Sequence, residues 1–277
     1  MINRILSIAA VVAMGVFAVA CGKKETSAPA ADSTATVAIK EEVVNYTADT
    51  VASIGYVAYD ANKTEKLPVV LVVPEWWGVT DYTKSRVKQL AELGYLALAV
   101  DMYGHGKIAS NPQEAGAMAT PFYQNPALTK ARFSAALAQA KTYPQADTSR
   151  IAAIGYCFGG AVVLNIARMG VPLKGVVSFH GNLVGVPPTK GGITADVLVC
   201  HGAADGFVPA AEVTKFKTQM DSVGAKYTFK EYADATHAFT NPGATELGKK
   251  FSLPLAYNEA ADKGSWADMK DFFAKIF

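Results

Sequence analysis

A cysteine flanked by glycines is the part of the chain best suited to covalent chemistry. Cys157 lies in Gly-Tyr-Cys-Phe-Gly-Gly, residues 155–160, between an apolar strand-like run and a helix-like segment. This is the setting of a G-x-S-x-G nucleophile elbow, with cysteine in place of serine. The glycines allow a sharp turn, the helix N-terminus favours a thiolate, and the backbone N–H of Phe158 becomes a candidate oxyanion donor. The alternative is a buried structural cysteine beside packing glycines.

A nucleophilic cysteine needs a base, and the chain contains four histidines. His237 follows the last strand-like segment, and Asp205 follows the strand-like segment before it. Nucleophile, acid and base therefore occur in the chain order of one class of catalytic triad. We expect Asp205 to orient His237, and His237 to activate Cys157.

Four other residues near these positions are given no catalytic role. Asp234 is the rival acid, but it is only three residues from His237 and is expected to belong to the same loop. His201 is interpreted as a structural residue of a strand end, and His180 has no partner in view at a similar strand end. Cys200 lies about two strand spacings from Cys157, roughly 9–10 Å, which is too far for a disulfide. We therefore expect Cys200 to be a buried apolar residue.

The candidate residues must be positioned by strands and helices that alternate along the chain. Continuous β-branched runs such as 69–73 are typical of strands buried on both faces. The remaining strands are expected at 95–100, 151–155, 175–179, 197–200 and 227–232, and the helices at 81–94, 127–143, 161–169, from Pro209 onward and at 266–277. This alternation predicts an α/β fold with a mostly parallel central sheet and helices on both faces, in one domain over residues 41–277.

Composition excludes several classes of protein. The chain has 277 residues, of which 51% are hydrophobic, and a net charge of +2, so it is neither largely disordered nor a nucleic-acid binder. No C-x-x-C pair occurs and no spacing of His, Cys and Glu fits a metal site, so no metal and no cofactor are expected. Residues 243–250 spell most of a phosphate-binding loop. They lack its final Ser or Thr and follow no strand, so we interpret them as a polar surface loop.

The N-terminus has the features of an export signal. A basic start is followed by an apolar run over residues 5–20, which is short for a membrane span and predicts a signal peptide at residues 1–20. Cys21 follows at once, so the region resembles a bacterial lipoprotein signal in which Cys21 is lipidated, and residues 21–40 are expected to be a flexible tether. The alternative is simple cleavage and secretion. We expect a protein of the cell envelope or periplasm that meets a membrane only through this lipid anchor.

The chain from about Val43 to Phe277 resembles the dienelactone hydrolase family, which has the α/β-hydrolase fold. The resemblance rests on the elbow at 155–160, on Gly-x-x-Asp-x-x-Val-Pro at 202–209, on His-x-Phe at 237–239, and on Glu75 and the Asp-Met-Tyr motif at 101–103. It implies a Cys157–His237–Asp205 triad that acts through a thioester. It also implies that Glu75 pairs with the resting thiol and that the backbone N–H of Trp76 is the second oxyanion donor.

The sequence departs from the family pattern where the substrate would bind. The family's best-known members hold a substrate carboxylate with two arginines, but His105 stands near the first position and Asn241 at the second. Loss of both forked cations removes bidentate carboxylate recognition, so a neutral or differently charged ester, lactone or thioester is expected. The expected pocket residues are Trp77, Tyr103, His105, Phe239 and Asn241.

The function expected from these residues is hydrolysis of a small ester, lactone or thioester by a cysteine nucleophile. Two alternatives from other classes stay open. One is a tethered binding or scaffold protein that keeps a hydrolase fold without turnover. The other is a redox-sensing thiol at Cys157, although no second cysteine is placed to resolve an oxidised sulfur. The sequence leaves the oligomeric state undetermined.

Overall fold

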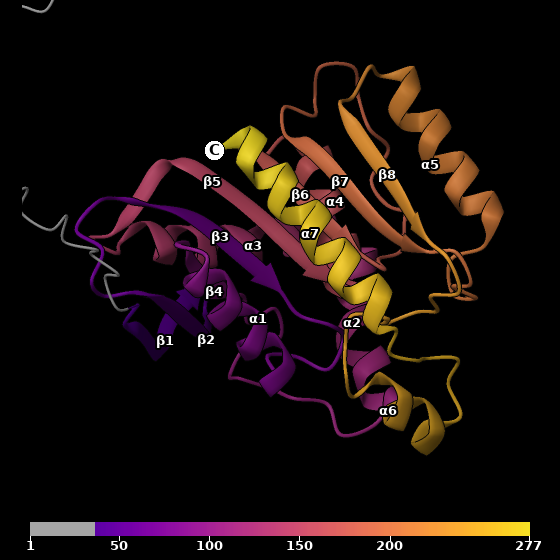
Figure 1. The fold of residues 1–277 in the computed structure, drawn as a ribbon, viewed down its shortest axis with the longest axis horizontal. Helices are drawn as coiled ribbons and strands as arrows, with labels where there is room; N and C mark the ends of the chain where they lie inside the picture. The colour runs from indigo at the N-terminus through magenta and orange to yellow at the C-terminus, as the bar shows by residue number, and fades with distance from the viewer. Residues whose placement is uncertain (1–36) are drawn as a thin grey trace, which may run out of the picture. The chain divides into compact units, whose positions relative to one another are not determined.

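The computed structural model describes residues 37–277, which fold around one eight-stranded sheet (Figure 1). The strands are β1 (Ile39–Ala48), β2 (Val51–Asp60), β3 (Leu67–Val73), β4 (Leu96–Ala99), β5 (Ala146–Tyr156), β6 (Gly175–Phe179), β7 (Asp196–Gly202) and β8 (Tyr227–Tyr232). The helices are α1 (Asp81–Glu92), α2 (Pro112–Gln124), α3 (Pro126–Lys141), α4 (Phe158–Arg168), α5 (Ala210–Ser222), α6 (Ala244–Phe251) and α7 (Glu259–Ile276).

The sheet has the order β1-β2-β4-β3-β5-β6-β7-β8. Strands β1 and β2 pair antiparallel with each other and β2 pairs antiparallel with β4, while every pair from β4 to β8 is parallel. The expected α/β fold with a mostly parallel sheet is therefore confirmed. Parallel strands end at the same edge of the sheet, so the loops that follow β3, β5, β6, β7 and β8 converge there.

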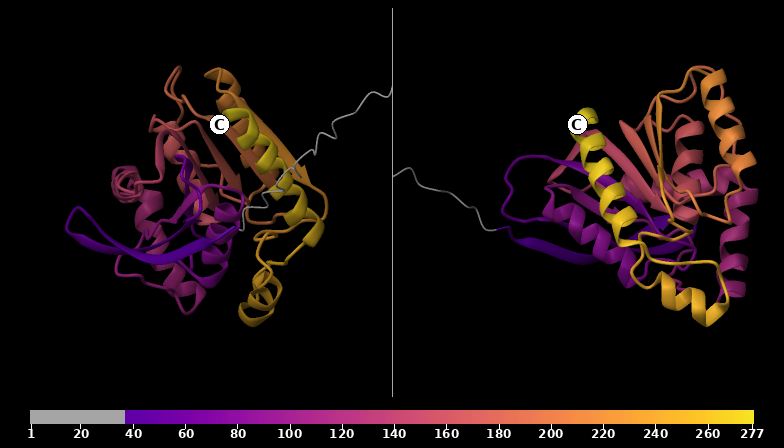
Figure 2. Two further views of the ribbon diagram at one scale, coloured as in Figure 1. Left: turned by 60° about the vertical axis from the view of Figure 1, so that its left-hand side comes forward. Right: turned by 45° about the vertical axis from the view of Figure 1, so that its right-hand side comes forward.

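Helices cover both faces of the sheet. Figures 1 and 2 show α7 crossing one of these faces. On that face α1 and α7 bury apolar side chains such as Leu90 and Phe273 against the sheet. On the other face α3, α4 and α5 bury side chains such as Phe133, Val163 and Phe216. Strands covered on both sides carry continuous apolar runs, which is why β3, β4 and β6 are recognisable from the sequence.

The C-terminal part departs from the sequence-based expectation. Residues 244–251 form helix α6 and not the polar loop expected, because Leu247 and Phe251 share one helix face that packs beside Trp77. Helix α7 begins at Glu259, about two turns before the expected start at Trp266, and the side chain of Asn258 caps it by accepting from the N–H of Ala261.

The N-terminal part also contains elements that are not among those predicted from the sequence. Strands β1 and β2 form a long hairpin, and α2 precedes α3. Strand β1 begins at Ile39, so the last two residues of the segment expected to be a tether lie in a strand. The expected signal peptide at residues 1–20 and the lipidation site Cys21 lie outside the described residues.

The remaining cysteine of the domain behaves as expected. In strand β7, Cys200 is fully buried, and its position pairs with Phe179 of β6, which in turn pairs with Tyr156 of β5. One strand, β6, therefore lies between Cys200 and the end of β5, and both Cys157 and Cys200 are free thiols.

Candidate active site

Cys157 lies at a sharp turn between β5 and α4. Its backbone has φ 53° and ψ −115°, a left-handed conformation that is strained for any residue with a Cβ. Two glycines make the turn possible. A Cβ on Gly155 would lie 2.0 Å from the carbonyl oxygen of Gly159, and a Cβ on Gly159 would lie 2.2 Å from that of Val73. The turn therefore presents Cys157 at the carboxyl edge of the sheet, directly before a helix.

Three side chains from separate loops meet at this edge. The Sγ of Cys157 lies 3.0 Å from Nε2 of His237, and Nδ1 of His237 lies 2.8 Å from Oδ2 of Asp205. The second oxygen of Asp205 accepts the backbone N–H of Phe207 at 2.9 Å. Asp234, the rival acid, is exposed. The structure therefore brings together the three residues that the sequence suggested as nucleophile, base and acid.

The charge of His237 is set by its two partners. Burial lowers its pKa, but the sulfur of Cys157 and the hydrogen-bonded carboxylate of Asp205 outweigh burial and raise the pKa to about 10. At neutral pH the imidazole is therefore protonated, and its two N–H groups donate to the sulfur and to the carboxylate. A cysteine sulfur hydrogen-bonded to an imidazole that is oriented by a carboxylate is the arrangement of a nucleophile with its base.

The side chain of His180 is hydrogen-bonded to the backbone of Cys157. The N–H of Cys157 donates to Nδ1 of His180 at 3.1 Å and also to the carbonyl of Phe179 at 3.0 Å. Burial lowers the pKa of His180 well below its usual value, and the positive charge of His237 lowers it further, so the ring is neutral. Since Nδ1 accepts, the ring proton lies on Nε2 and donates to Oγ1 of Thr240 at 2.7 Å.

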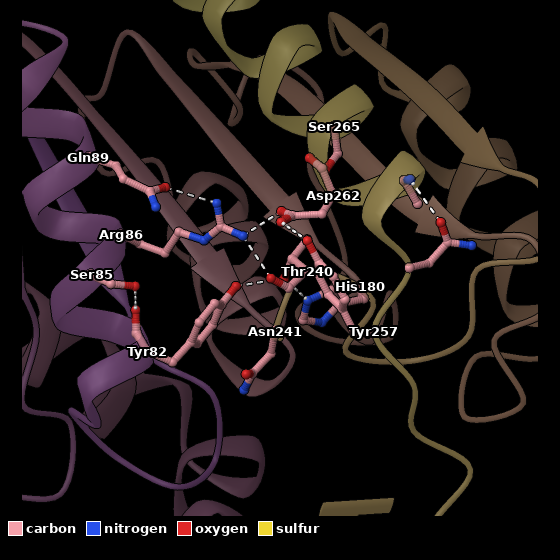
Figure 3. Close-up of polar contacts among 12 residues, drawn as sticks. Tyr82, Ser85, Arg86, Gln89, His180, Thr240, Asn241, Tyr257, Asp262 and Ser265 are labelled. Carbon is pink, nitrogen blue, oxygen red and sulfur yellow. Dashed lines mark hydrogen bonds and ion pairs between the residues drawn. The ribbon is translucent and has the colours of Figure 1, made fainter. Parts of the chain in front are cut away.

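The contact between His180 and Thr240 continues into helices α1 and α7 (Figure 3). The hydroxyl of Tyr82 lies 2.7 Å from Oγ1 of Thr240, and the guanidinium of Arg86 donates to the Thr240 carbonyl at 2.7 Å. Arg86 also forms a buried ion pair with Asp262 of α7. A buried polar network thus links the nucleophile to α1 and α7, two helices on the same face of the sheet. The sequence alone shows no partner for His180, although its place at the end of β6, beside β5, is a signal that it lies near Cys157.

Glu75 follows β3 and is buried, with 2% of its surface exposed. Its carboxylate accepts from Nδ2 of Asn241 at 2.7 Å, and burial raises its pKa to about 7. The expected pairing of Glu75 with the resting thiol differs from the structure, where the sulfur of Cys157 contacts His237. The carboxyl group of Glu75 is bonded to Asn241, and the sulfur is bonded to His237.

The two expected oxyanion donors belong to the start of α4 and to the loop after β3. Phe158 is the first residue of α4, and the first N–H groups of a helix have no partner within the helix. Trp76 lies in the loop after β3. In the same loop, the carbonyl oxygen of Pro74 is so close to α4 that a Cβ added to Gly159 would lie 2.6 Å from it. The loop that carries Trp76 therefore packs against the start of α4.

A cavity of about 220 Å³ opens beside Cys157. It is lined by Glu75, Trp76, Trp77, Gly116, Ala119, Thr120, Tyr123, Cys157, Asn182, Phe207, His237, Ala238 and Leu255. Its walls are mostly apolar, and no Lys or Arg of the described chain is among the lining residues. Trp77 lies in the wall as expected, and its ring packs on those of Trp76 and Phe251.

The other four residues expected to line the pocket lie elsewhere. Tyr103 is one layer back, where its hydroxyl donates to the Trp76 carbonyl at 2.9 Å. His105 belongs to the loop whose backbone meets Ala52 of β2, Phe239 is fully buried against His180, and Asn241 contacts Glu75. A side chain that lies behind the pocket wall and one that lines it can occupy similar positions in a sequence motif, so the sequence does not separate the two groups.

No group of His, Cys, Asp and Glu within residues 37–277 is arranged to hold a metal ion. Over the same residues, none of the helices combines the length and apolar character that crossing a membrane requires.

Comparison with known proteins places the chain in a family. The model of the dienelactone hydrolase family matches residues 53–277. A protein of Methylorubrum extorquens with the provisional name carboxymethylenebutenolidase is 32% identical over 196 residues, 66% of this chain and 67% of its own. A solved dienelactone hydrolase-like promiscuous phosphotriesterase from metagenomic libraries is 34% identical, with a TM-score of 0.81 over 87% of this chain and 99% of its own. A structure from Klebsiella pneumoniae, 24% identical with a TM-score of 0.73 over 86% of this chain and 99% of its own, shares the fold.

Proposed function

The chain belongs to the dienelactone hydrolase family and is a hydrolase of ester or lactone bonds, and we propose that Cys157, His237 and Asp205 catalyse the reaction through a thioester intermediate. One observation carries this proposal. A thiol at a strained turn lies 3.0 Å from an imidazole whose other nitrogen is 2.8 Å from a buried carboxylate. Neither a structural cysteine nor a scaffold needs this arrangement.

In the first half of the reaction the thiolate of Cys157 forms a bond to the carbonyl carbon of the substrate. The carbonyl oxygen becomes negative and is held by the backbone N–H groups of Phe158 and Trp76. When the tetrahedral intermediate collapses, the bond from carbon to the leaving oxygen breaks, and the imidazolium of His237 gives its proton to that oxygen. An alcohol leaves, or the opened end of a lactone is freed, and a thioester remains on Cys157.

In the second half the now neutral His237 takes a proton from water as the water oxygen attacks the thioester carbon. The bond between carbon and sulfur then breaks, the carboxylic acid leaves, and the thiolate is restored beside a protonated His237. Asp205 keeps the imidazole oriented through both steps.

The cavity favours a small uncharged substrate. The lining contains no Lys or Arg that could pair with a carboxylate, and the acid that lies in the wall, Glu75, would repel one when ionised. At about 220 Å³ the cavity suits one small group, such as a short acyl chain or an aromatic ring. A neutral ester or lactone satisfies both conditions.

The test is hydrolysis of a panel of neutral esters and lactones by the purified protein and by Cys157→Ala. We expect turnover by the wild type and loss of at least about a thousandfold in kcat/KM in the variant. Equal activity of the two proteins would contradict the proposal.

A neutral phosphotriester is a second candidate substrate. The observation that favours it is the uncharged cavity, together with 34% identity to a protein described as a promiscuous phosphotriesterase. The thiolate of Cys157 would form a bond to phosphorus as the bond from phosphorus to the aryloxide leaving group breaks. Water would then attack phosphorus, the bond between phosphorus and sulfur would break, and the phosphodiester and the thiolate would be released. Release of p-nitrophenol from a dialkyl p-nitrophenyl phosphate, absent in Cys157→Ala, tests this candidate.

We also propose that the protein is exported and that Cys21 carries a lipid, on the basis of the apolar run before it and the small, polar segment after it. Mass spectrometry of the mature N-terminus tests this. A diacylated cysteine at position 21 supports a lipoprotein, and an unmodified N-terminus contradicts it.

A further inference from the structure

One face of helix α2 forms a wall of the cavity. Gly116, Ala119, Thr120 and Tyr123 all line it, and their spacing of three, one and three residues places them on one side of an α-helix. Tyr123 packs its ring against that of Phe158, with 5.5 Å between centroids, so this wall reaches the residue after the nucleophile.

The structure gives no reason for a glycine at position 116 of this helix. Glycine inside a helix is less favourable than alanine by roughly 1 kcal/mol. The backbone of Gly116 does not have a positive φ, and a Cβ added there would meet no atom within 4 Å. The glycines of the elbow are different, because a Cβ on Gly155 or Gly159 would collide with the backbone. The fold therefore does not require glycine at 116, and what glycine preserves there is space in the cavity.

The wall is also uncharged and mostly apolar. The hydroxyl of Thr120 donates to the carbonyl of Gly116 at 2.7 Å, so its polar atom is already bonded within the helix. Ala119 contributes only a methyl group, and it is buried. A group bound against this face would therefore find hydrocarbon contacts and no ionic partner.

We propose that the α2 face is the subsite for the apolar part of the ester and that Gly116 sets the size of the group it accepts. The inference rests on the proposed esterase function and deepens it, because it assigns the substrate class to hydrocarbon or aryl esters. A side chain at position 116 fills the subsite and excludes the larger members of that class, while the smallest ester still reaches Cys157.

The experiment compares wild type, Gly116→Ala, Gly116→Leu and the control Ala117→Leu on p-nitrophenyl acetate, butyrate and octanoate. Ala117 is the exposed neighbour on the same helix and does not line the cavity, so it matches the change in side chain without filling the subsite. We expect Gly116→Leu to lower the ratio of kcat/KM for octanoate to that for acetate about tenfold or more, with Gly116→Ala in between and Ala117→Leu unchanged. Thermal unfolding verifies folding, and Gly116→Ala is expected to raise the Tm.

If the wild type is active and Gly116→Leu has the same ratio of kcat/KM for octanoate to that for acetate, the subsite proposal is wrong. The esterase proposal would then still hold. If wild type hydrolyses no ester, the esterase proposal fails, and alkylation of Cys157 still tests the wall. In that case N-phenylmaleimide must react at least about tenfold more slowly, relative to iodoacetamide, with Gly116→Leu than with Ala117→Leu. Equal relative rates in the two variants would overturn the inference.

Discussion

The backbone N–H of Cys157 donates to Nδ1 of His180, which has no charge and no freedom to change its tautomer. This contact fixes the peptide that carries the nucleophile, and the ring of His180 lies edge-on to that of His237, with 5.4 Å between centroids. The nucleophile and the base are therefore positioned by the same buried histidine, which does not itself touch the substrate cavity.

Replacement of His180 should affect turnover more than substrate binding. We expect His180→Phe, which keeps a ring and removes the acceptor, to lower kcat by roughly tenfold to a hundredfold with KM within about threefold of wild type. His180→Asn keeps an acceptor near the Cys157 N–H and should recover part of the loss. Steady-state kinetics of the three proteins measure this. Equal kcat for both variants would show that the ring serves packing only.

The charge on His237 predicts a reactive thiol at neutral pH. His237→Ala removes the cation beside the sulfur, so alkylation of Cys157 by iodoacetamide at pH 7 should slow by at least about tenfold. Cys200 is buried and serves as an internal unreactive thiol, which peptide mapping distinguishes from Cys157. Unchanged alkylation in His237→Ala would mean that the imidazole does not activate the sulfur.

Glu75 should make stability fall as pH rises. Burial raises its pKa to about 7, so the folded state binds the proton more tightly than the unfolded chain, whose value is near 4.5. Its contribution is fully present below pH 4.5 and is lost as pH rises through 7, a difference on the order of 3 kcal/mol. Glu75→Gln stays neutral throughout, so its free energy of unfolding in urea should fall less between pH 5 and pH 8 than that of wild type. Parallel pH profiles would contradict this assignment.

The elbow should not tolerate a methyl group. A Cβ at Gly159 would lie 2.2 Å from the carbonyl of Val73, so Gly159→Ala should lower the free energy of unfolding by about 3 kcal/mol or prevent folding. Gly206→Ala is the matched control, since a Cβ there meets nothing within 4 Å, and it should be close to neutral. Similar urea midpoints for the two variants would show that the elbow is looser than described.

The positions of Cys157, Asp205 and His237 could be predicted because parallel strands end at one edge of the sheet. Residues that follow β5, β7 and β8 must then meet, whatever the details of packing. The buried runs of β3 and β6 were equally visible, because a strand covered on both faces has few polar residues.

Other features depend on packing between distant segments. The hydrogen bond between His180 and Thr240 forms only if the loop after β8 lies over the end of β6. Arg86 bonds to Thr240 and Asp262 only because α1 and α7 cover the same face of the sheet. Helix α6 is hard to predict from the sequence because its large apolar residues, Leu247 and Phe251, are too few to show a clear helical period.

Trapping the thioester tests the central claim most directly. The protein is mixed with p-nitrophenyl acetate, quenched in acid within the burst of product, and analysed by intact mass and peptide mapping. We predict a mass increase of one acetyl group, located on Cys157 and absent from Cys157→Ala, with p-nitrophenol released in equal amount during the burst. Continued turnover by Cys157→Ala at the wild-type rate, or an acetyl group on any other residue of an active enzyme, would contradict the account.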